Sequence, residues 1–541
     1  MCLRRHILES KGSPVRRSGL RAVVALSAAA LAISACAGSP VERPDRIVLA
    51  DGQELGGYNP VAGYGELGVS PIYEGLLRPQ ANTDDRLPDL VPSLATSGPA
   101  QVGPRQWRLP LRAGVRFSDG STLDSSDVVT TYAAVRNPVV ASEISTNFTP
   151  IVDIRADGPG AVVVTMNTDA DPSPYLLLGI APSEKIEDAP VADWALNTAP
   201  VGTGPYELES LRPDQAVMAA REDYWGEAPE VTSLVFTYTP DDNTRAQRIA
   251  TGEVDGTSLP PKMLAAVANR DGVETVGVQS ADWRGVSFPA QNPFTADPRA
   301  RLAMNLGIDR EAVITDVLDG HGRAAGTPVA AVYGDAYDPD AEFAFDATGA
   351  ESVLDAAGWV TGPAGIRERD GREASFELLY NAQDTLRRDL AVAFAAAMEP
   401  LGIEVTPRGS SWDEIETLLD TSAVVLGGGA TPYSIDSQVY DTLHTRVPNS
   451  SPYSNPGDFA PPGMDALLQQ ARESAPSPEN DARYRDIQSL YKTAPSYVFL
   501  VFLDHTYAYR DLGWQQSPPI LEPHSHGVAW GPWWHTAAWT R

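Results

Sequence analysis

The sequence predicts an α/β protein with two lobes, and the clearest evidence lies between residues 375 and 408. Residues 375–380 (SFELLY) are typical of a strand, and residues 403–406 (IEVT) predict another after Gly402. Between them, apolar residues recur at every fourth position from Leu386 to Met398, as on one face of a helix. A strand, a helix and a strand within about 35 residues form a βαβ crossover, which pairs its strands in parallel.

Helices and strands also alternate on both sides of this unit. The other elements that we expect are a strand over 231–238, a helix over 244–251, a turn at 253–256, a helix starting near Pro298, a helix from an Asp309 N-cap to Gly320, and a strand over 423–426 that runs into Gly427–Gly429. Because such elements lie on both sides of residue 285, we expect two α/β lobes. With 541 residues, the chain exceeds what one core supports.

An apolar run of 14 residues, Ala22 to Ala35, follows three arginines near the N-terminus. A membrane-spanning helix needs about 20 apolar residues, so this run is short, and its basic flank is typical of a secretory signal. The sequence Ile-Ser-Ala-Cys at 33–36 resembles a bacterial lipobox, which predicts a signal over 1–35 and lipid on Cys36. An ordinary signal with a chance cysteine, or an uncleaved anchor, are the alternatives.

Composition limits the classes of function. The other cysteine is Cys2, so removal of the signal leaves a chain without a disulfide. Residues 1–35 hold six Lys or Arg and one Asp or Glu, and losing them takes the net charge from −30 to −35. Such an acidic chain is unsuited to nucleic acid and to electrostatic adhesion to anionic lipid. We therefore expect membrane contact through the lipid alone.

The sequence offers little support for catalysis. It contains no Gly-x-Ser-x-Gly, His-Glu-x-x-His or Walker A motif and no cysteine cluster. Residues 63–68 (GYGELG) match the G-x-G-x-x-G pattern, but no strand leads into them, so a loop is favoured over a dinucleotide site. We expect no enzymatic activity, cofactor or metal site.

A late histidine group lies among four tryptophans. His524, His526 and His535 suggest a metal or haem site, yet no cysteine or carboxylate set completes a group of ligands. We therefore favour an aromatic closing segment that packs on one lobe.

Seven stretches carry a resemblance to known proteins. In chain order they are IYEGLLRP (72–79), WRLPLRAGVRFSDGSTLDSSDVV (107–129), PVGTGPYEL (200–208), REDYWGEAP (221–229), GEVDG (252–256), PFTADPRARLAMNLGIDREAVI (293–314) and ESVLDAAGW (351–359). Together they resemble the family 5 extracytoplasmic solute-binding proteins, the dipeptide- and oligopeptide-binding lipoproteins of ABC importers. The likeness extends from about residue 46 almost to the C-terminus.

This resemblance implies a two-lobed, periplasmic-binding-protein-like fold of type II, in the large peptide-binder class, with a ligand cleft between the lobes. After a lipidated tether over 36–45, it implies a first lobe over 46–285, with an inserted subdomain that includes 107–129. A second lobe follows over 286–505, and residues 506–541 return to the first.

The resemblance and the strand ends together suggest ligand-binding residues. Asn381 and the glycines at 427–429 follow predicted strands, where ligands bind in open α/β sheets. By resemblance, Trp412 lines a side-chain pocket, and Gly428 and Gly429 offer main-chain groups to an extended peptide. Gly63 and Tyr64 fall near the loop that meets the ligand from the first lobe. The alternatives are that Trp412 belongs to the core and that the glycines form only a turn.

Two departures from the family pattern concern the ligand's charged ends. Ala430 stands where oligopeptide binders place an acid for the α-ammonium group, and Asp436, near Tyr433, is the nearest acid. Asp436 is equally suited to cap the helix that the stretch SIDSQVYDTL (434–443) predicts. No arginine lies between Trp412 and Gly427, where one branch of the family keeps one near the ligand carboxylate.

The expected function is that of a monomeric substrate-binding lipoprotein. It would capture short peptides outside the cytoplasmic membrane and deliver them to ABC permease subunits. The same transport role with haem or another non-peptide cargo is the alternative. A secreted hydrolase and a structural envelope lipoprotein are the alternatives of another class.

Overall fold

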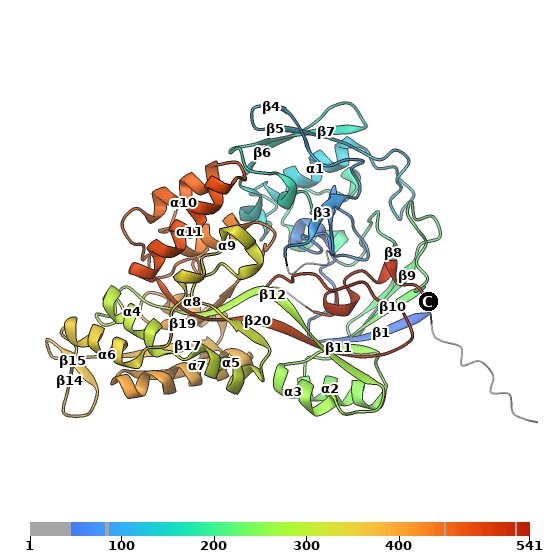
Figure 1. Cartoon of the computed structure of the whole chain (residues 1–541). Coiled ribbons are helices and arrows are strands. Elements are labelled where there is room, and N and C mark those ends of the chain that lie inside the picture. The colour runs from blue at the N-terminus through green and yellow to red at the C-terminus, as the bar shows by residue number, and fades with distance from the viewer. Residues whose placement is uncertain (1–44, 82–85, 448–450, 525–526) are drawn as a thin grey trace, which may run out of the picture. The chain divides into compact units, whose positions relative to one another are not determined.

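A computed structural model describes residues 45–541 apart from 82–85, 448–450 and 525–526 (Figure 1). Most of its strands form one 11-stranded sheet, in the order β18-β17-β19-β12-β20-β11-β1-β10-β9-β8, with β13 paired to β20. These strands are β1 (Arg46–Asp51), β8 (Tyr206–Arg212), β9 (Gln215–Ala220), β10 (Ser233–Tyr238), β11 (Gly256–Ser258), β12 (Val273–Ser287), β13 (Gly322–Ala324), β17 (Ser375–Asn381), β18 (Glu404–Ser410), β19 (Ala423–Gly428) and β20 (Tyr497–Arg510).

Three smaller sheets complete the described strands. They are β2 (Leu77–Gln80) with β3 (Asp89–Pro92); β4 (Ala100–Gly103), β5 (Gln106–Pro110), β6 (Ile151–Ala156) and β7 (Ala161–Met166); and β14 (Val360–Thr361), β15 (Arg367–Arg369) and β16 (Arg372–Glu373). The stretch 107–129, expected in an inserted subdomain, contributes to the four-stranded sheet β4–β7 and to helix α1.

The helices are α1 (Ser125–Val135), α2 (Asp242–Thr251), α3 (Pro261–Val267), α4 (Pro298–Gly307), α5 (Arg310–Leu318), α6 (Ala347–Ala356), α7 (Thr385–Met398), α8 (Trp412–Leu418), α9 (Ile435–Leu443), α10 (Met464–Glu473) and α11 (Pro478–Thr493). Asp309 caps α5 as predicted, because its side chain accepts the Ala312 N–H. The helix ends at Leu318, slightly before the expected Gly320, since Asp319 already adopts a left-handed conformation. None of the described helices has both the length and the apolar character that a membrane crossing requires.

The predicted βαβ unit is confirmed. β17 and β18 pair in parallel from Ser375 opposite Glu404 to Asn381 opposite Ser410, and α7 connects them. Alternate residues of β19 enter two different cores: Ala423 and Val425 pack with α4, α5 and α7, whereas Val424 and Leu426 pack with α8 to α11. Helices therefore cover both faces of this half of the sheet, as in doubly wound α/β folds.

β12 and β20 connect the two halves of the sheet and lie side by side (Figure 1). Their pairing changes register between Gln279 and Trp283, so β12 bulges at residues 280–282. There the chain pairs instead with a C-terminal segment, where the Ala281 N–H donates to the Glu522 carbonyl at 2.9 Å. The expected lobe boundaries, 285/286 and 505/506, fall inside these two strands. The division into two lobes that move relative to each other when a ligand binds stays a prediction.

The largest core joins the start of the chain to its end. It contains Ile47 and Leu49 of β1 together with Trp530, Trp533, Trp534 and Trp539. These tryptophans are 9% exposed or less, which confirms the interpretation of the late aromatic residues as a closing segment. His526 lies outside the described residues.

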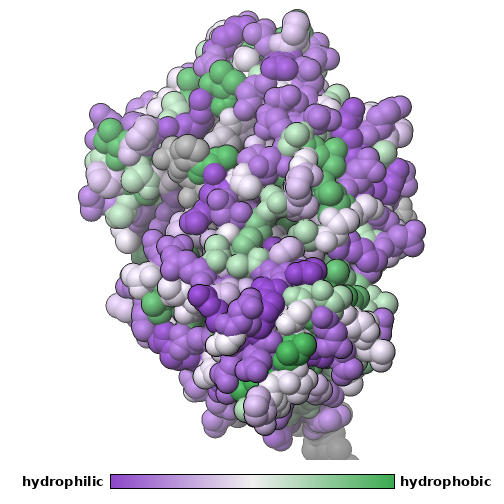
Figure 2. Space-filling view, turned by 90° about the vertical axis from the view of Figure 1, so that its left-hand side faces the viewer, coloured by the Kyte–Doolittle hydropathy of each residue, from purple (hydrophilic) through white to green (hydrophobic). Residues whose placement is uncertain are grey.

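The molecular surface is largely hydrophilic on the side that Figure 2 displays. Hydrophobic residues appear there as small patches separated by hydrophilic ones. This distribution agrees with the acidic composition of the sequence.

Candidate functional site

A cavity of about 490 Å³ lies where the carboxyl end of β17 faces the other half of the sheet. We call it the arginine cavity. It is lined on one side by Asn381, Asp384, Arg387 and Trp412, and on the other by Asp242, Arg245, Ser258 to Pro261 and Leu503 to Thr506, with Arg284 between them. It thus brings together two of the predicted residues, Asn381 and Trp412.

Three arginines line this cavity; Arg245 pairs with Asp242, and the other two are Arg284 and Arg387. Arg284 of β12 is 4% exposed, and Arg387 of α7 lies 5.2 Å from the centroid of the Trp412 ring. Each is paired through Nη1, Arg284 with Asp282 and Arg387 with Asp384. However, the Nε atom of each is buried without a hydrogen-bond partner among the described residues. Buried donors of this kind are costly to leave unsatisfied, so they favour an acceptor that comes from outside the chain.

The charges around the cavity influence one another. Burial lowers the pKa of Arg284 well below its usual value, and the nearby positive charge of Arg387 adds to this effect. Burial acts to raise the pKa of Asp384, but Arg387 and Arg284 outweigh it, and this pKa lies below its usual value. An additional negative group in the cavity would relieve the repulsion between the two arginines.

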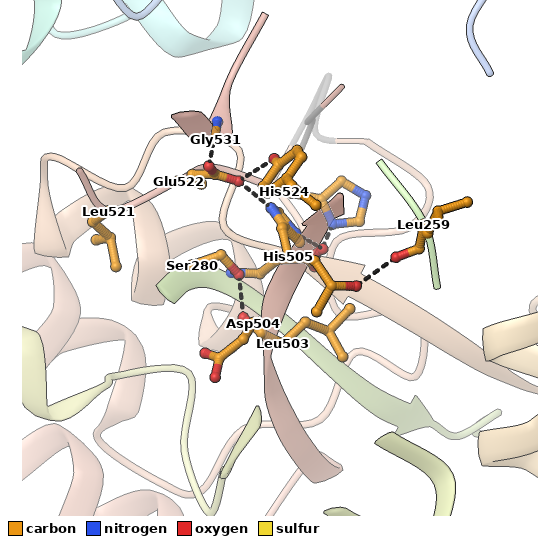
Figure 3. A network of polar contacts seen from close by, with 12 residues as sticks. Leu259, Ser280, Leu503, Asp504, His505, Leu521, Glu522, His524 and Gly531 are labelled. Atoms are coloured by element: carbon orange, nitrogen blue, oxygen red, sulfur yellow. Dashed lines mark hydrogen bonds and ion pairs between the residues drawn. The ribbon is translucent and has the colours of Figure 1, made fainter. Parts of the chain in front are cut away.

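Arg284 is held by a buried polar cluster at the β12 bulge, which we call the junction network. Its other members are Asp282, His505, Glu522 and His524. Figure 3 shows His505, Glu522 and His524. His505 Nε2 lies 3.1 Å from Asp282 Oδ2, and His505 Nδ1 lies 2.7 Å from Glu522 Oε2. His524 Nδ1 lies 2.7 Å from Asp282 Oδ1 and 3.1 Å from Arg284 Nη1. The network therefore joins β12, β20 and the C-terminal segment.

Protonation in the junction network follows from burial. Burial, and then the charge of Arg284, lowers the pKa of both His505 and His524 well below the usual value. A neutral imidazole donates from one ring nitrogen only. His505 faces a carboxyl group at each ring nitrogen, so its tautomer decides which of the two accepts its N–H.

A second cavity, of about 240 Å³, contains the other predicted polar residues. We call it the tyrosine cavity; Tyr175, Tyr333, Tyr433 and Tyr484 line it together with Asp436 and Arg472. Asp436 accepts hydrogen bonds from Arg472 Nε at 2.8 and 3.1 Å. Burial raises the pKa of Asp436 although Arg472 opposes this. The tyrosine and arginine cavities share no lining residue.

The alternative role of Asp436 as a helix N-cap is wrong. The N-cap of α9 is Ser434, and Asp436 lies in the first turn of that helix. Its carboxylate turns to Arg472 of α10 instead of to a backbone N–H of its own helix.

The two glycines after β19 are required by close packing. A Cβ atom on Gly428 would lie 2.4 Å from the Trp283 ring, and one on Gly429 would lie 2.1 Å from the Ala281 carbonyl oxygen. Gly429 also has φ +102°, and its carbonyl accepts the His524 N–H at 2.9 Å. This acceptor is thus already paired within the chain.

Gly63 and Tyr64 lie in a turn away from both cavities. Tyr64 packs against Tyr58 and Tyr73, with ring centroids 5.1 and 6.3 Å apart, and burial raises its pKa. Gly63 has φ +108° and ends a short 3₁₀ helix. The G-x-G-x-x-G stretch is therefore a run of turns, as expected. The predicted lipidation site, Cys36, lies outside the described residues.

The sequence-based predictions missed Arg284, Arg387 and the junction network. One signal was present: Asp282 and Arg284 place two charges in the otherwise uncharged stretch SADWRGVSF (280–288), which forms a central strand. Charges in such a strand are buried, and buried charges require partners.

Three of the stretches behind the family resemblance contact one another. Glu74 of IYEGLLRP accepts hydrogen bonds from Tyr224 Oη at 2.8 Å and Trp225 Nε1 at 2.7 Å, both in REDYWGEAP. Gly202 and Gly204 of PVGTGPYEL pack against the Ile72 backbone so closely that a Cβ atom would lie 2.1 and 2.5 Å from it. These residues maintain the fold of the first half of the chain.

The family model of bacterial extracellular solute-binding proteins, family 5, matches residues 89–450. The chain belongs to this family. Family 5 proteins are substrate-binding components of ABC importers and act as transport binders. Protein XP55 of Streptomyces lividans is 34% identical over 509 residues, which cover 92% of this chain and 91% of that protein.

Solved structures of family 5 solute-binding proteins have the same two-lobed fold. NikZ from Campylobacter jejuni in complex with Ni(L-His) superposes with a TM-score of 0.77 at 21% identity, covering 92% of this chain and 99% of that one. The oligopeptide-binding protein AppA from Bacillus subtilis, in complex with a nonapeptide, gives 0.74 at 20% identity, covering 91% and 98%. The predicted fold class is confirmed.

Proposed function

We propose that this solute-binding protein captures short peptides outside the cytoplasmic membrane and delivers them to its permease, and that Arg284 and Arg387 hold the peptide carboxylate. The observation that carries the proposal is the pair of buried, unpartnered Nε atoms beside one cavity of about 490 Å³. Arginine side chains pair well with carboxylates through charge-assisted hydrogen bonds. A nonapeptide and Ni(L-His), the ligands of the two relatives above, both bring a carboxylate.

The remaining contacts are assigned by position. Asn381 and Trp412 would contact the cargo in the arginine cavity, with Trp412 offering an apolar surface beside Arg387. Asp436 would accept the α-ammonium group, since its carboxylate oxygens can accept further hydrogen bonds beyond those from Arg472. The sequence also suggested ligand contacts by Gly63, Tyr64, Gly428, Gly429 and Tyr433. These contacts contribute less to the affinity for the peptide, because each of these residues packs against other residues of the chain.

Titration with modified peptides tests both assignments. We expect a free tripeptide to bind, and amidation of its C-terminus to weaken binding by about 30-fold or more, since losing one partner of a buried charge pair costs about 2–5 kcal/mol. Acetylation of the N-terminus removes the positive charge of the ammonium group. It should therefore also weaken binding if Asp436 holds that group. Equal affinity for the free and amidated peptides would contradict the role of the arginines.

Mass spectrometry of the ligand released from purified protein identifies the cargo directly. Peptides are the expected result. Haem or a nickel complex, released or bound in the same titration series, would replace the peptide with another cargo in the same transport role.

We further propose that Cys36 carries a lipid that anchors the protein to the cell membrane. The motivating observation is its position at the end of the 14-residue apolar run. Cys36→Ala should move the protein from the membrane fraction to the soluble or secreted fraction. A variant that stays with the membrane, together with a wild-type chain that has no acyl mass shift, would contradict the anchor.

A further inference from the structure

A third cavity, of about 330 Å³, lies within the first half of the chain. We call it the aromatic cavity. Leu49 of β1 and Leu234 of β10 line one part of it, and the segments 68–79, 224–227 and 528–538 supply most of the remaining lining. It shares no lining residue with the arginine or tyrosine cavity. The inference drawn from it therefore does not depend on the proposed function.

Arg78 and Ser93 give this cavity an unused capacity to bind a negative group. Ser93 is 1% exposed, and its Oγ atom has no hydrogen-bond partner among the described residues. Arg78 is half-buried and forms no ion pair of 4 Å or less among the described residues, although its charge acts to lower the pKa of the nearby Glu74 against the effect of burial. Glu74 also lines the cavity, but it already accepts the Tyr224 and Trp225 hydrogen bonds.

Apart from its tyrosines, the other titratable groups of the cavity are His535, Glu227 and Glu74, the last of which interacts with the charge of Arg78. Burial, and then the charge of Arg78, lowers the pKa of His535 to about 4, so this ring is neutral near pH 7. Glu227 is at the cavity too, but its side chain is exposed to water. Within the described lining, Arg78 is consequently the positively charged side chain with which an anion can pair.

The walls of the cavity are suited to an apolar body. Tyr73, Trp225, Trp533 and Trp534 all line it. Ligand pockets typically combine apolar and aromatic walls with a small number of well-placed polar groups, and they start at about 300 Å³. We propose that the aromatic cavity is a second binding site, for a small carboxylic acid with an aromatic ring, whose carboxylate pairs with Arg78 and the Ser93 hydroxyl.

Two aromatic acids and their uncharged analogues test this site. Phenylacetate and indole-3-acetate are titrated into the full chain by calorimetry, with phenylacetamide and indole-3-acetamide as neutral counterparts of nearly the same shape. We expect the acids to bind at one site and the amides to bind at least about tenfold more weakly, because the charge-assisted bond to Arg78 is lost. Equal binding of acids and amides, or no binding of any probe, would overturn the proposal.

Four variants locate the binding. Arg78→Gln should weaken the acids by about tenfold or more, whereas Arg108→Gln, on the exposed surface of the same half of the chain, should leave their affinity unchanged. Arg387→Gln should also leave it unchanged. If Arg387→Gln, and not Arg78→Gln, removes binding, the acids occupy the arginine cavity and the proposal is wrong. Arg78→Lys, which keeps the charge, should retain part of the affinity and controls for misfolding of the glutamine variant.

Discussion

Asp282→Ala should lower the free energy of unfolding by about 3–5 kcal/mol, the usual effect of removing one partner of a buried ion pair. Asp282 is fully buried and contacts Arg284, His505 and His524. Without it, the Arg284 guanidinium stays buried without its carboxylate partner. Urea denaturation of the wild-type and variant proteins, followed by tryptophan fluorescence, measures the difference.

The matched control for Asp282→Ala is Asp157→Ala. Asp157 forms a hydrogen-bonded ion pair with Arg108 at 2.7 Å, but both side chains are more than 40% exposed. Exposed pairs contribute about 0.2–1 kcal/mol, so this variant should unfold almost as the wild type does. If the two variants lose the same stability, the junction network does not stabilise the fold in the way that its burial indicates.

Arg387→Gln should weaken the binding of a free peptide by about 30-fold or more, because the carboxylate then loses a buried charged partner. Gln lacks the guanidinium that lies over the Trp412 ring and pairs with Asp384, so the variant also loses these two contacts. Calorimetric titration gives the affinity, and a melting curve of the ligand-free protein shows whether the loss is confined to binding. Amidation of the peptide should cost less affinity in the variant than in the wild type, because the two changes share the interaction with Arg387.

Arg388→Gln is the control, one residue along the same helix. Arg388 is 51% exposed, pairs with Asp389 and does not line the cavity. Its replacement should change the affinity by no more than a few-fold. Equal losses for the two variants would show that the charge of the helix, and not a specific contact of Arg387, determines binding.

The local parts of the fold could be predicted from the sequence. The βαβ unit at 375–410 was recognisable because its apolar residues alternate in the strands and recur every fourth position in the helix. Asp309 could be recognised as a cap because capping depends only on neighbouring residues. Asn381 could be placed beside a cavity because ligands lie at the carboxyl ends of strands.

The remainder depends on contacts between distant segments. Arg284 and His524 are 240 residues apart, and no local pattern indicates that they meet. For the same reason, the sequence could not show that Trp412 and Asp436, only 24 positions apart, line separate cavities. The partner of Asp436 is Arg472, on another helix, and it replaces the capping bond that the local sequence suggested.

The closure of the largest core by the C-terminal tryptophans has a consequence for the order of folding. Ile47 and Leu49 share that core with Trp533 and Trp539, and the Val528 N–H donates to Asp51 across 477 positions of the chain. Contacts of such high contact order form late, because the entropy of closing a long loop must be lost before they stabilise anything. The half of the chain that is synthesised first should consequently be the last to become resistant to proteases. During refolding, the segment around α7, whose contacts are largely local, should gain protection from hydrogen exchange before β1 does.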